Sequence, residues 1–313
     1  MNNDNQELMI RAAWMYYSDN MTHEQIAQKL HLSRVKVTRM LQKAREEGIV
    51  EISITYPLPL NHRLSQELEA NFNLNEAVII PTGQTYDMTL KETGRAAADY
   101  LNHVIEPGCR VGFGWSTTVS HMGAHLSAPT KRIDFSVVDL MGSMLGRSNP
   151  YSVSGKIAET YGATLYPLTV PIVVRNKEAY DAIMNDLNVQ HSFELVRSCD
   201  LGFAGVGNMG ITSTLVQSNY LTPEEMDNIH KDGAVGDILM RYYDIDGNPV
   251  PTVMDDFVIG LTWAELKRLP RVVVVAVGQH KIEPVVGILR SGICDVLITD
   301  AETAEGVLAY SAP

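Results

Sequence analysis

The sequence predicts an α/β protein with two parts, an N-terminal winged helix-turn-helix and a larger domain built on a mostly parallel sheet. Three observations predict this fold class. Residues 22–47 carry two capped helical patterns around a short turn. From residue 76 onward, short β-branched runs alternate with helical patterns. Pro57 and Pro59 separate the two regions. With 313 residues, 45% of them hydrophobic and 20% charged, the composition is that of a globular protein.

The head, residues 1–56, is expected to contain three helices. Apolar spacing predicts the first over residues 5–17. Thr22, with a glutamine three residues later, forms a capping-box pattern that starts the second helix near residue 23. Ser33 is expected to cap a third helix that runs to about residue 47, where a glycine follows.

The third helix is expected to be basic and polar on its outer faces. Its inward residues are Val37, Met40, Leu41 and Ala44. A helix of this kind fits the major groove of DNA, where cations reach guanine edges and phosphates. The candidate base-reading residues are Arg34, Lys36 and Thr38. The candidate phosphate contacts are Ser33, Arg39 and Lys43. A three-helix cap or interaction module is the structural alternative.

Charge is distributed unevenly along the chain. The net charge is −12, yet between Lys29 and Arg45 there are six basic residues and no acidic one. The first 55 residues balance to zero, so residues 56–313 carry the whole negative excess. A basic stripe on a neutral head favours a local surface for double-stranded DNA. From charge alone, a solvated helix explains the stripe equally well.

The head is expected to end in a strand and a linker. Apolar and polar residues alternate over 49–55, which predicts a strand and hence the winged variant. Residues 57–60 contain two prolines and predict the linker. The body, residues 61–313, is assigned to effector binding and oligomerisation. It opens with a helix predicted over 61–72.

The rest of the body alternates strands and helices. The candidate strands are 77–80, 110–113, 135–140, 163–168, 201–206, 272–277 and 296–299. The candidate helices are 87–105, 117–126, 151–161, 177–187, 190–198, 223–230, 281–291 and 301–310. This alternation predicts a mostly parallel, Rossmann-like sheet with helices on both faces. Ligands of such sheets bind beyond the carboxyl ends of the strands.

One loop after a strand combines glycines and hydroxyl side chains. Glycines let backbone N–H groups approach a ligand, and hydroxyls at a helix start favour an anion such as phosphate. The candidate effector-binding residues in this loop are Gly112, Gly114, Trp115, Ser116 and Thr117. A plain helix cap is the alternative.

Two further residues are candidates for the same site. Lys281 stands at a predicted helix start, where the helix dipole disfavours a cation, so a bound phosphate or carboxylate is expected beside it. A surface lysine is the alternative. Asp237 follows Gly233 and Gly236 and is a candidate acceptor for sugar or polyol hydroxyls, with an Asx turn as the alternative. Arg147, in a loop after another strand, is an additional candidate.

Other motifs are set aside. Residues 205–210 match the GxGxxG spacing of dinucleotide sites, but residues 211–220 make a poor helix start. His121 and His125 are four residues apart without a third ligand, so no metal is expected.

Nothing in the sequence predicts membrane insertion or export. The longest strongly apolar run, 272–277, is too short to span a bilayer, and the first five residues do not resemble a signal peptide. Three scattered cysteines suit a reducing compartment, so a cytoplasmic protein without membrane contact is expected.

Several segments together resemble the SorC family (SorC/DeoR-type) of sugar-responsive bacterial transcription regulators. They are residues 21–27, 45–50, 112–115, 233–239 and 298–304. The resemblance implies a body similar to sugar-phosphate isomerases and deaminases that has lost catalysis and kept the pocket. By position, residues 112–117 and Lys281 would then hold a phosphate and Asp237 the effector hydroxyls, while Asp300 would be a ligand or a structural residue. The family also implies homo-oligomers, dimers or tetramers, and no cofactor.

The function expected is regulation of a carbohydrate-catabolic operon. The chain would bind double-stranded operator DNA under control of a small phosphorylated sugar or polyol. The alternative is a sugar-phosphate isomerase or deaminase with an appended helix-turn-helix. That enzyme needs a general base, for which Asp237 and His280 are the candidates, but no clear second acid–base partner is present. No catalytic residue is therefore assigned.

Overall fold

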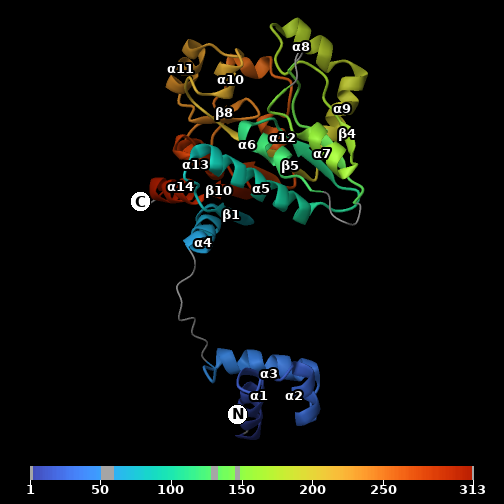
Figure 1. The fold of residues 1–313 in the computed structure, drawn as a ribbon, viewed down its shortest axis with the longest axis vertical. Helices are drawn as coiled ribbons and strands as arrows, with labels where there is room; N and C mark the ends of the chain where they lie inside the picture. Colours follow the sequence, from blue (N-terminus) through green and yellow to red (C-terminus); the bar gives the residue numbers. More distant parts are fainter. Residues whose placement is uncertain (1–2, 51–59, 128–132, 145–148, 312–313) are drawn as a thin grey trace. The chain divides into compact units, whose positions relative to one another are not determined.

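A computed structural model describes residues 3–50, 60–127, 133–144 and 149–311 (Figure 1). The chain divides into two compact units, Met1–Leu58 and Pro59–Pro313, and each is described by itself.

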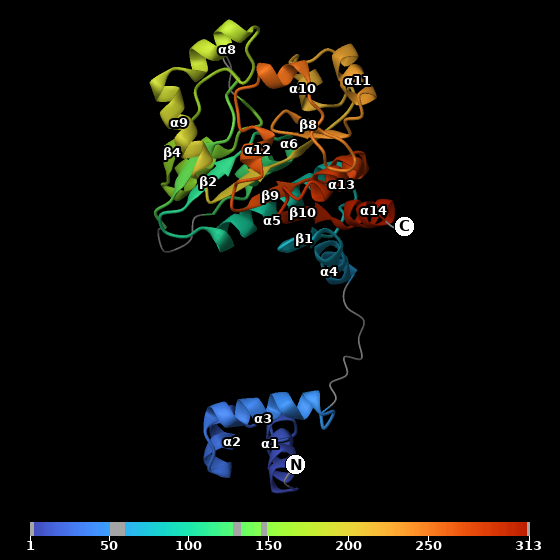
Figure 2. The same cartoon turned by 180° about the vertical axis from the view of Figure 1, so that it is seen from behind.

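The first unit is a three-helix head with its own apolar core. Its helices are α1 (Asn3–Tyr17), α2 (His23–Leu30) and α3 (Arg34–Glu46). Thr22 caps α2 in a complete capping box and Ser33 caps α3, as predicted. Both views show α3 lying across α1 and α2 (Figures 1 and 2). The core is closed by Ile26 of α2 and Val37 of α3, both fully buried. The helix-turn-helix arrangement expected from the sequence is confirmed.

The predicted wing and linker fall largely outside the described residues. Ile49 and Val50 form a bend, and residues 51–55 of the predicted strand are not described. The wing therefore stays a prediction. The linker was predicted over 57–60, but Leu60 already begins α4 (Leu60–Phe72).

The second unit is built on a seven-stranded sheet in which every pairing is parallel. All seven candidate strands are found in it. In spatial order the strands are β1 (Glu76–Ile80), β10 (Val296–Asp300), β9 (Val272–Val275), β5 (Leu201–Ala204), β2 (Arg110–Phe113), β3 (Ser136–Asp139) and β4 (Thr164–Tyr166).

The order of the strands reverses at the middle of the sheet. From β2 the chain adds β3 and β4 on one side, and then places β5, β9 and β10 on the other. Neighbouring strands β2 and β5 are therefore the topological switch point, with Val111 opposite Leu201 in register. In open α/β sheets the ligand crevice lies beyond the carboxyl ends of the strands at this point.

Helices cover both faces of the sheet. Along β9, Val273 and Val275 join one buried cluster, while Val272 and Val274 join the other, because successive side chains point to opposite faces. The remaining helices are α5 (Tyr86–Val104), α6 (Thr117–Ser120), α7 (Ser154–Tyr161), α8 (Lys177–Met184), α9 (Leu187–Arg197), α10 (Thr214–Gln217), α11 (Pro223–Lys231), α12 (Trp263–Leu266), α13 (Ile282–Arg290) and α14 (Ala301–Ser311). Short 3₁₀ turns lie at His121–Ala124, Val253–Asp256 and Gln279–Lys281. No helix in these described parts is long and apolar enough to cross a membrane.

The edge strand β1 is covered by α4. Asn61 of this helix donates to the carbonyl oxygen of Ile79 at 3.3 Å, and Ser65 donates to that of Ala77. Glu69 accepts the N–H of Ala77 at 2.9 Å. Side chains thus satisfy backbone groups that an edge strand would otherwise leave open.

Two local expectations were wrong. The helix predicted over 117–126 is α-helical only over Thr117–Ser120, where the side chains of Ser120 and His121 bond to the carbonyl oxygen of Thr117, and it continues as a 3₁₀ turn to Ala124. A second sheet, antiparallel and three-stranded, was missed altogether. It comprises β6 (Val206–Asn208), β7 (Gly236–Ile238) and β8 (Arg241–Tyr243).

Candidate functional site

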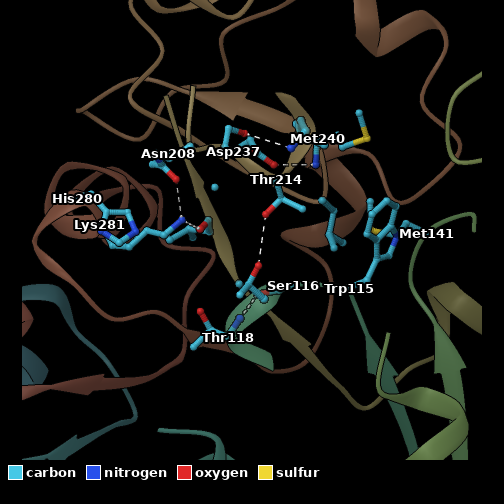
Figure 3. Close-up of a pocket in the computed structure, with 18 of the residues that line it drawn as sticks. Trp115, Ser116, Thr118, Met141, Asn208, Thr214, Asp237, Met240, His280 and Lys281 are labelled. Carbon is cyan, nitrogen blue, oxygen red and sulfur yellow. Dashed lines mark hydrogen bonds between the residues drawn. The ribbon is translucent and has the colours of Figure 1, made fainter. Parts of the chain in front are cut away.

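A cavity of about 520 Å³ opens beyond the carboxyl ends of β2, β5 and β9, at the switch point (Figure 3). The segment after β2 contributes Trp115 and Ser116, and the turn after β9 contributes His280 and Lys281. Asp237 comes from β7 of the small sheet. Residues far apart in the sequence therefore meet where the topology places a ligand.

The structure brings most of the predicted effector-binding residues together. Those that line the cavity are Trp115, Ser116, Thr117, Asp237 and Lys281. The cavity lining does not include Gly112 or Gly114. A Cβ at Gly112 would overlap the side chain of Leu140, and one at Gly114 would overlap that of Leu239. In this structure both glycines permit close packing beneath the site.

Lys281 is partly buried at the side of the cavity, with its ammonium group turned into the protein. Its ammonium group donates to the carbonyl oxygen of Val206 at 2.8 Å and to Oδ1 of Asn208 at 3.2 Å. Burial lowers the pKa of Lys281 to about 8, and the nearby carboxylate of Asp237 only partly opposes this. We expected an anion to explain this lysine. The structure shows two neutral oxygen atoms holding it, which leaves the positive charge without a direct ion pair among the described residues.

Asp237 is the acidic counterpart of this site. Its Oδ2 accepts the N–H of Met240 at 3.1 Å. Burial raises the pKa of Asp237 to about 6, against the opposing effect of Lys281. The accepted bond closes a turn in which Leu239 and Met240 both have positive φ, 51° and 62°, which side chains other than glycine adopt at a cost. Asp237 therefore has a structural role besides its place on the cavity wall.

Hydroxyl groups from two segments line the rest of the polar wall. Ser116 caps α6 by accepting the N–H of Thr118 at 3.2 Å. Thr117 and Thr214 place their hydroxyl oxygens 3.4 Å apart across the two segments. The hydroxyl residues in the lining are Ser116, Thr117, Thr118, Thr212, Ser213 and Thr214. The last three were not identified as site residues from the sequence. Three consecutive hydroxyl residues shortly after a strand could have indicated them.

Aromatic rings form the other walls. Trp115 donates its ring N–H to the carbonyl oxygen of Gly142 at 3.1 Å and stacks on Tyr151. Tyr86 meets His280 edge to face, with ring centroids 5.5 Å apart. Burial and the charge of Lys281 lower the pKa of His280, which favours the neutral imidazole. The cavity is thus lined by hydroxyl groups and aromatic rings, with the ammonium group of Lys281 at its side.

Among the other residues considered from the sequence, Asp300 does not line the described cavity. Asp300 accepts from the hydroxyls of Thr82 and Thr303 and so ties the end of β10 to its neighbours. Residues 206–208 of the GxGxxG segment form strand β6, and the next helix, α10, begins at Thr214. No group of three or more metal-ligating side chains occurs within residues 3–50, 60–127, 133–144 and 149–311. Arg147 lies outside the described residues.

The second candidate site is the exposed surface of α3. Arg34, Lys36 and Arg39 are exposed. Ser33 is also exposed, and its hydroxyl accepts the N–H of Lys36 at 3.2 Å. Thr38 is exposed, and its hydroxyl donates to the carbonyl oxygen of Arg34 in the same helix at 3.1 Å.

The last of the predicted DNA contacts lies further along α3. Lys43 is exposed and pairs with Glu47 at 3.4 Å, one turn further on. A surface pair of this kind contributes little and is readily exchanged for a phosphate.

Comparison with known proteins identifies the class. The family described as "Putative sugar-binding domain" matches residues 57–309. The deoxyribonucleoside regulator of Bacillus subtilis is 30% identical over 317 residues, which cover 98% of this chain and 99% of that protein. The crystal structure of the full-length sorbitol operon regulator SorC from Klebsiella pneumoniae covers 98% of this chain and 100% of its own, with 27% identity and a TM-score of 0.75.

The chain belongs to the SorC/DeoR family of sugar-binding transcriptional regulators. The erythritol catabolism regulatory protein EryD of Brucella abortus is a further relative, 26% identical over 96% of each chain. These relatives are regulators and not enzymes, so the isomerase or deaminase alternative is set aside.

Proposed function

We propose that this chain regulates a carbohydrate-catabolic operon and that a small phosphorylated sugar or polyol, bound in the cavity, controls it. The observation that carries the proposal is Lys281, a buried cation held by neutral oxygen atoms in a hydroxyl-lined cavity. A phosphate beside Lys281 would supply the counter-charge, and hydroxyl side chains suit the polar groups of a sugar.

The relatives support the carbohydrate part of the proposal. They are named for sorbitol, erythritol and deoxyribonucleosides, which are polyols or contain a sugar. The identity of the effector would then depend on the walls around Lys281, formed here by Trp115, Tyr86 and the hydroxyl segments.

The head would engage operator DNA through α3. Ser33, Arg34, Lys36, Thr38, Arg39 and Lys43 are the residues proposed to contact the duplex. A single small head makes few contacts, so a cytoplasmic dimer or tetramer that holds paired heads would gain affinity through avidity. The effector would act by preferring one arrangement of the subunits and so changing the operator affinity.

The test combines ligand and DNA binding on the full chain. Thermal unfolding is followed with pentose, hexose and polyol monophosphates beside their unphosphorylated parents, and product formation is measured in parallel. A shift with a monophosphate, without turnover, supports the proposal. Binding to the chain's own upstream DNA is then measured with and without that compound. Failure to bind any upstream segment at low salt would contradict the regulatory role.

Lys281→Ala is the sharpest variant for the effector part. Loss of a charge-assisted hydrogen bond weakens binding by about 10–100-fold, so the variant should lose its thermal shift with the monophosphate and keep its DNA binding. Lys267→Ala, an exposed lysine that is not among the cavity residues, is the matched control and should respond as the unmodified chain does. A normal response of Lys281→Ala would rule out the phosphate assignment.

A further inference from the structure

One apolar side chain of α3 lies in solvent. The helix contains Val37, Met40, Leu41 and Ala44 in the core of the head, but Val35 has 62% of its surface exposed. Valine is a moderate helix former, and an exposed one adds nothing to the core. A methyl-bearing side chain in the first turn of a basic helix is therefore available to a partner.

Helix geometry places Val35 at the centre of the outward face. At 3.6 residues per turn, Val35, Arg39 and Gln42 fall on one stripe, opposite the buried residues. We call these three residues the reading stripe. Arg39 and Gln42 are exposed, and Arg39 forms no ion pair within the described part of the chain. The amide of Gln42 donates to Glu46 at 2.9 Å.

The two flanks of the stripe differ. Thr38 lies 3.0 Å from Nδ1 of His23 at the start of α2, so its flank faces α2. Lys36 lies about 160° around the helix axis from Thr38, and Lys43 follows Lys36 after two turns. These two lysines therefore project from the flank away from α2.

We propose that α3 reads a duplex through Val35 and Arg39, with Val35 packed on the 5-methyl group of a thymine and Arg39 donating to O6 and N7 of a guanine. The proposal rests on the proposed DNA binding of the head. The thymine methyl is the apolar group that base pairs present in the major groove, and arginine with guanine is the commonest specific contact. Lys36 and Lys43 then contact phosphates. This reverses the roles that the sequence suggested for Lys36 and Arg39.

The geometry also limits the spacing of the two bases. Four residues of α-helix rise about 6 Å, and neighbouring base pairs are about 3.4 Å apart along the duplex. Each half-site would therefore contain a thymine within about two base pairs of a guanine.

The experiment uses the full chain and needs no known operator. Duplexes are selected from a randomised library, and each thymine of the selected site is replaced by deoxyuridine, which lacks only the methyl group. At one position the replacement should weaken binding about fourfold, the effect of one buried methyl group. With Val35→Ala the same replacement should have a smaller effect, because the shorter side chain contacts less of the methyl group. Lys36→Ala is the matched control and should weaken both duplexes equally.

The outcomes separate this inference from the proposed function. If the chain selects a specific duplex but Val35→Ala loses as much affinity as the unmodified chain when that thymine is replaced by deoxyuridine, the inference is overturned and DNA binding stands. If Arg39→Ala weakens binding equally on all sequences, the guanine assignment is overturned. If the unmodified chain binds no duplex, with or without sugar monophosphates, the DNA-binding proposal fails and the inference fails with it.

Discussion

At the scale of single residues, the buried ammonium of Lys281 is the clearest link between structure and ligand. Among the described residues its hydrogen bonds reach only neutral oxygen atoms, so the cost of removing its charge from water is incompletely recovered there. Asp237 lowers this cost from a distance, since it influences the pKa of Lys281 without forming an ion pair with it in the described structure. An anionic ligand would therefore both bind and stabilise the body.

The pH dependence of effector binding follows from this lysine. Burial lowers the pKa of Lys281 to about 8, so the cation is present below that pH and is lost above it. A phosphate ester is mostly dianionic above about pH 6. Affinity for a sugar monophosphate should therefore be greatest between about pH 6 and 8 and should fall up to about tenfold per pH unit above 8.

Titration calorimetry at pH 7 and pH 9 measures this change directly. The Lys281→Gln variant is the control, because it has no proton to lose and its weaker binding should not change between the two pH values. An equal affinity of the unmodified chain at both pH values would show that the ammonium of Lys281 does not contact the effector.

The sequence identified residues of this site more readily when their chemistry was unusual for their position. Lys281 at a helix start and the Ser116–Thr117 pair after a strand were found in this way, and all three line the cavity. Gly112 and Gly114 belong to the same motif, but they pack against Leu140 and Leu239. A glycine lets any neighbouring group approach the backbone closely. The sequence alone therefore does not show whether that group is a bound ligand or a side chain of the same protein.

At the scale of elements, the N-terminal cap of α3 joins folding to DNA contact. Ser33 accepts the N–H of Lys36 and is also a proposed phosphate contact. Ser33→Ala should destabilise α3 by about 1 kcal/mol through loss of the cap. Ser33→Asp keeps a capping oxygen and should preserve α3, but its negative charge would repel a phosphate.

Hydrogen exchange of the α3 amides and DNA affinity separate the two roles of Ser33. We expect faster exchange in Ser33→Ala alone, and weaker DNA binding in both variants. Unchanged DNA affinity of Ser33→Asp would place the Ser33 side chain away from the backbone of the duplex.

The strands were predictable where their residues are apolar or β-branched, and burial alone did not decide this, because β4 is largely exposed and was predicted, while β7 and β8 are buried and were missed. The seven strands of the parallel sheet are short apolar runs such as Val272–Val275, and all of them were found. Strands β6, β7 and β8 were missed because they contain glycine, aspartate, asparagine and arginine, which resemble loop residues. The pairing of β6 with β7 joins distant segments, and the hairpin of β7 and β8 turns at Leu239 and Met240, which lack the usual glycine or asparagine signal.

At the scale of the whole molecule, charge and function are divided along the chain. The net charge of −12 lies in residues 56–313, and the basic stripe lies in the head. Deletion of residues 1–56 should therefore abolish DNA binding and leave a folded, oligomeric body that keeps its thermal shift with the sugar monophosphate. Thermal unfolding and native mass spectrometry measure both properties. An aggregated product would contradict the predicted boundary between head and linker.

Helix α4 has a consequence for where such a deletion can begin. Its Asn61, Ser65 and Glu69 occupy the outer backbone groups of β1, the strand at one end of the sheet. A truncation beginning at residue 57 keeps this helix, whereas one beginning after Phe72 would expose a ready template for intermolecular strand addition. The first helix of the body thus closes an edge at which two truncated copies would otherwise be able to pair their β1 strands.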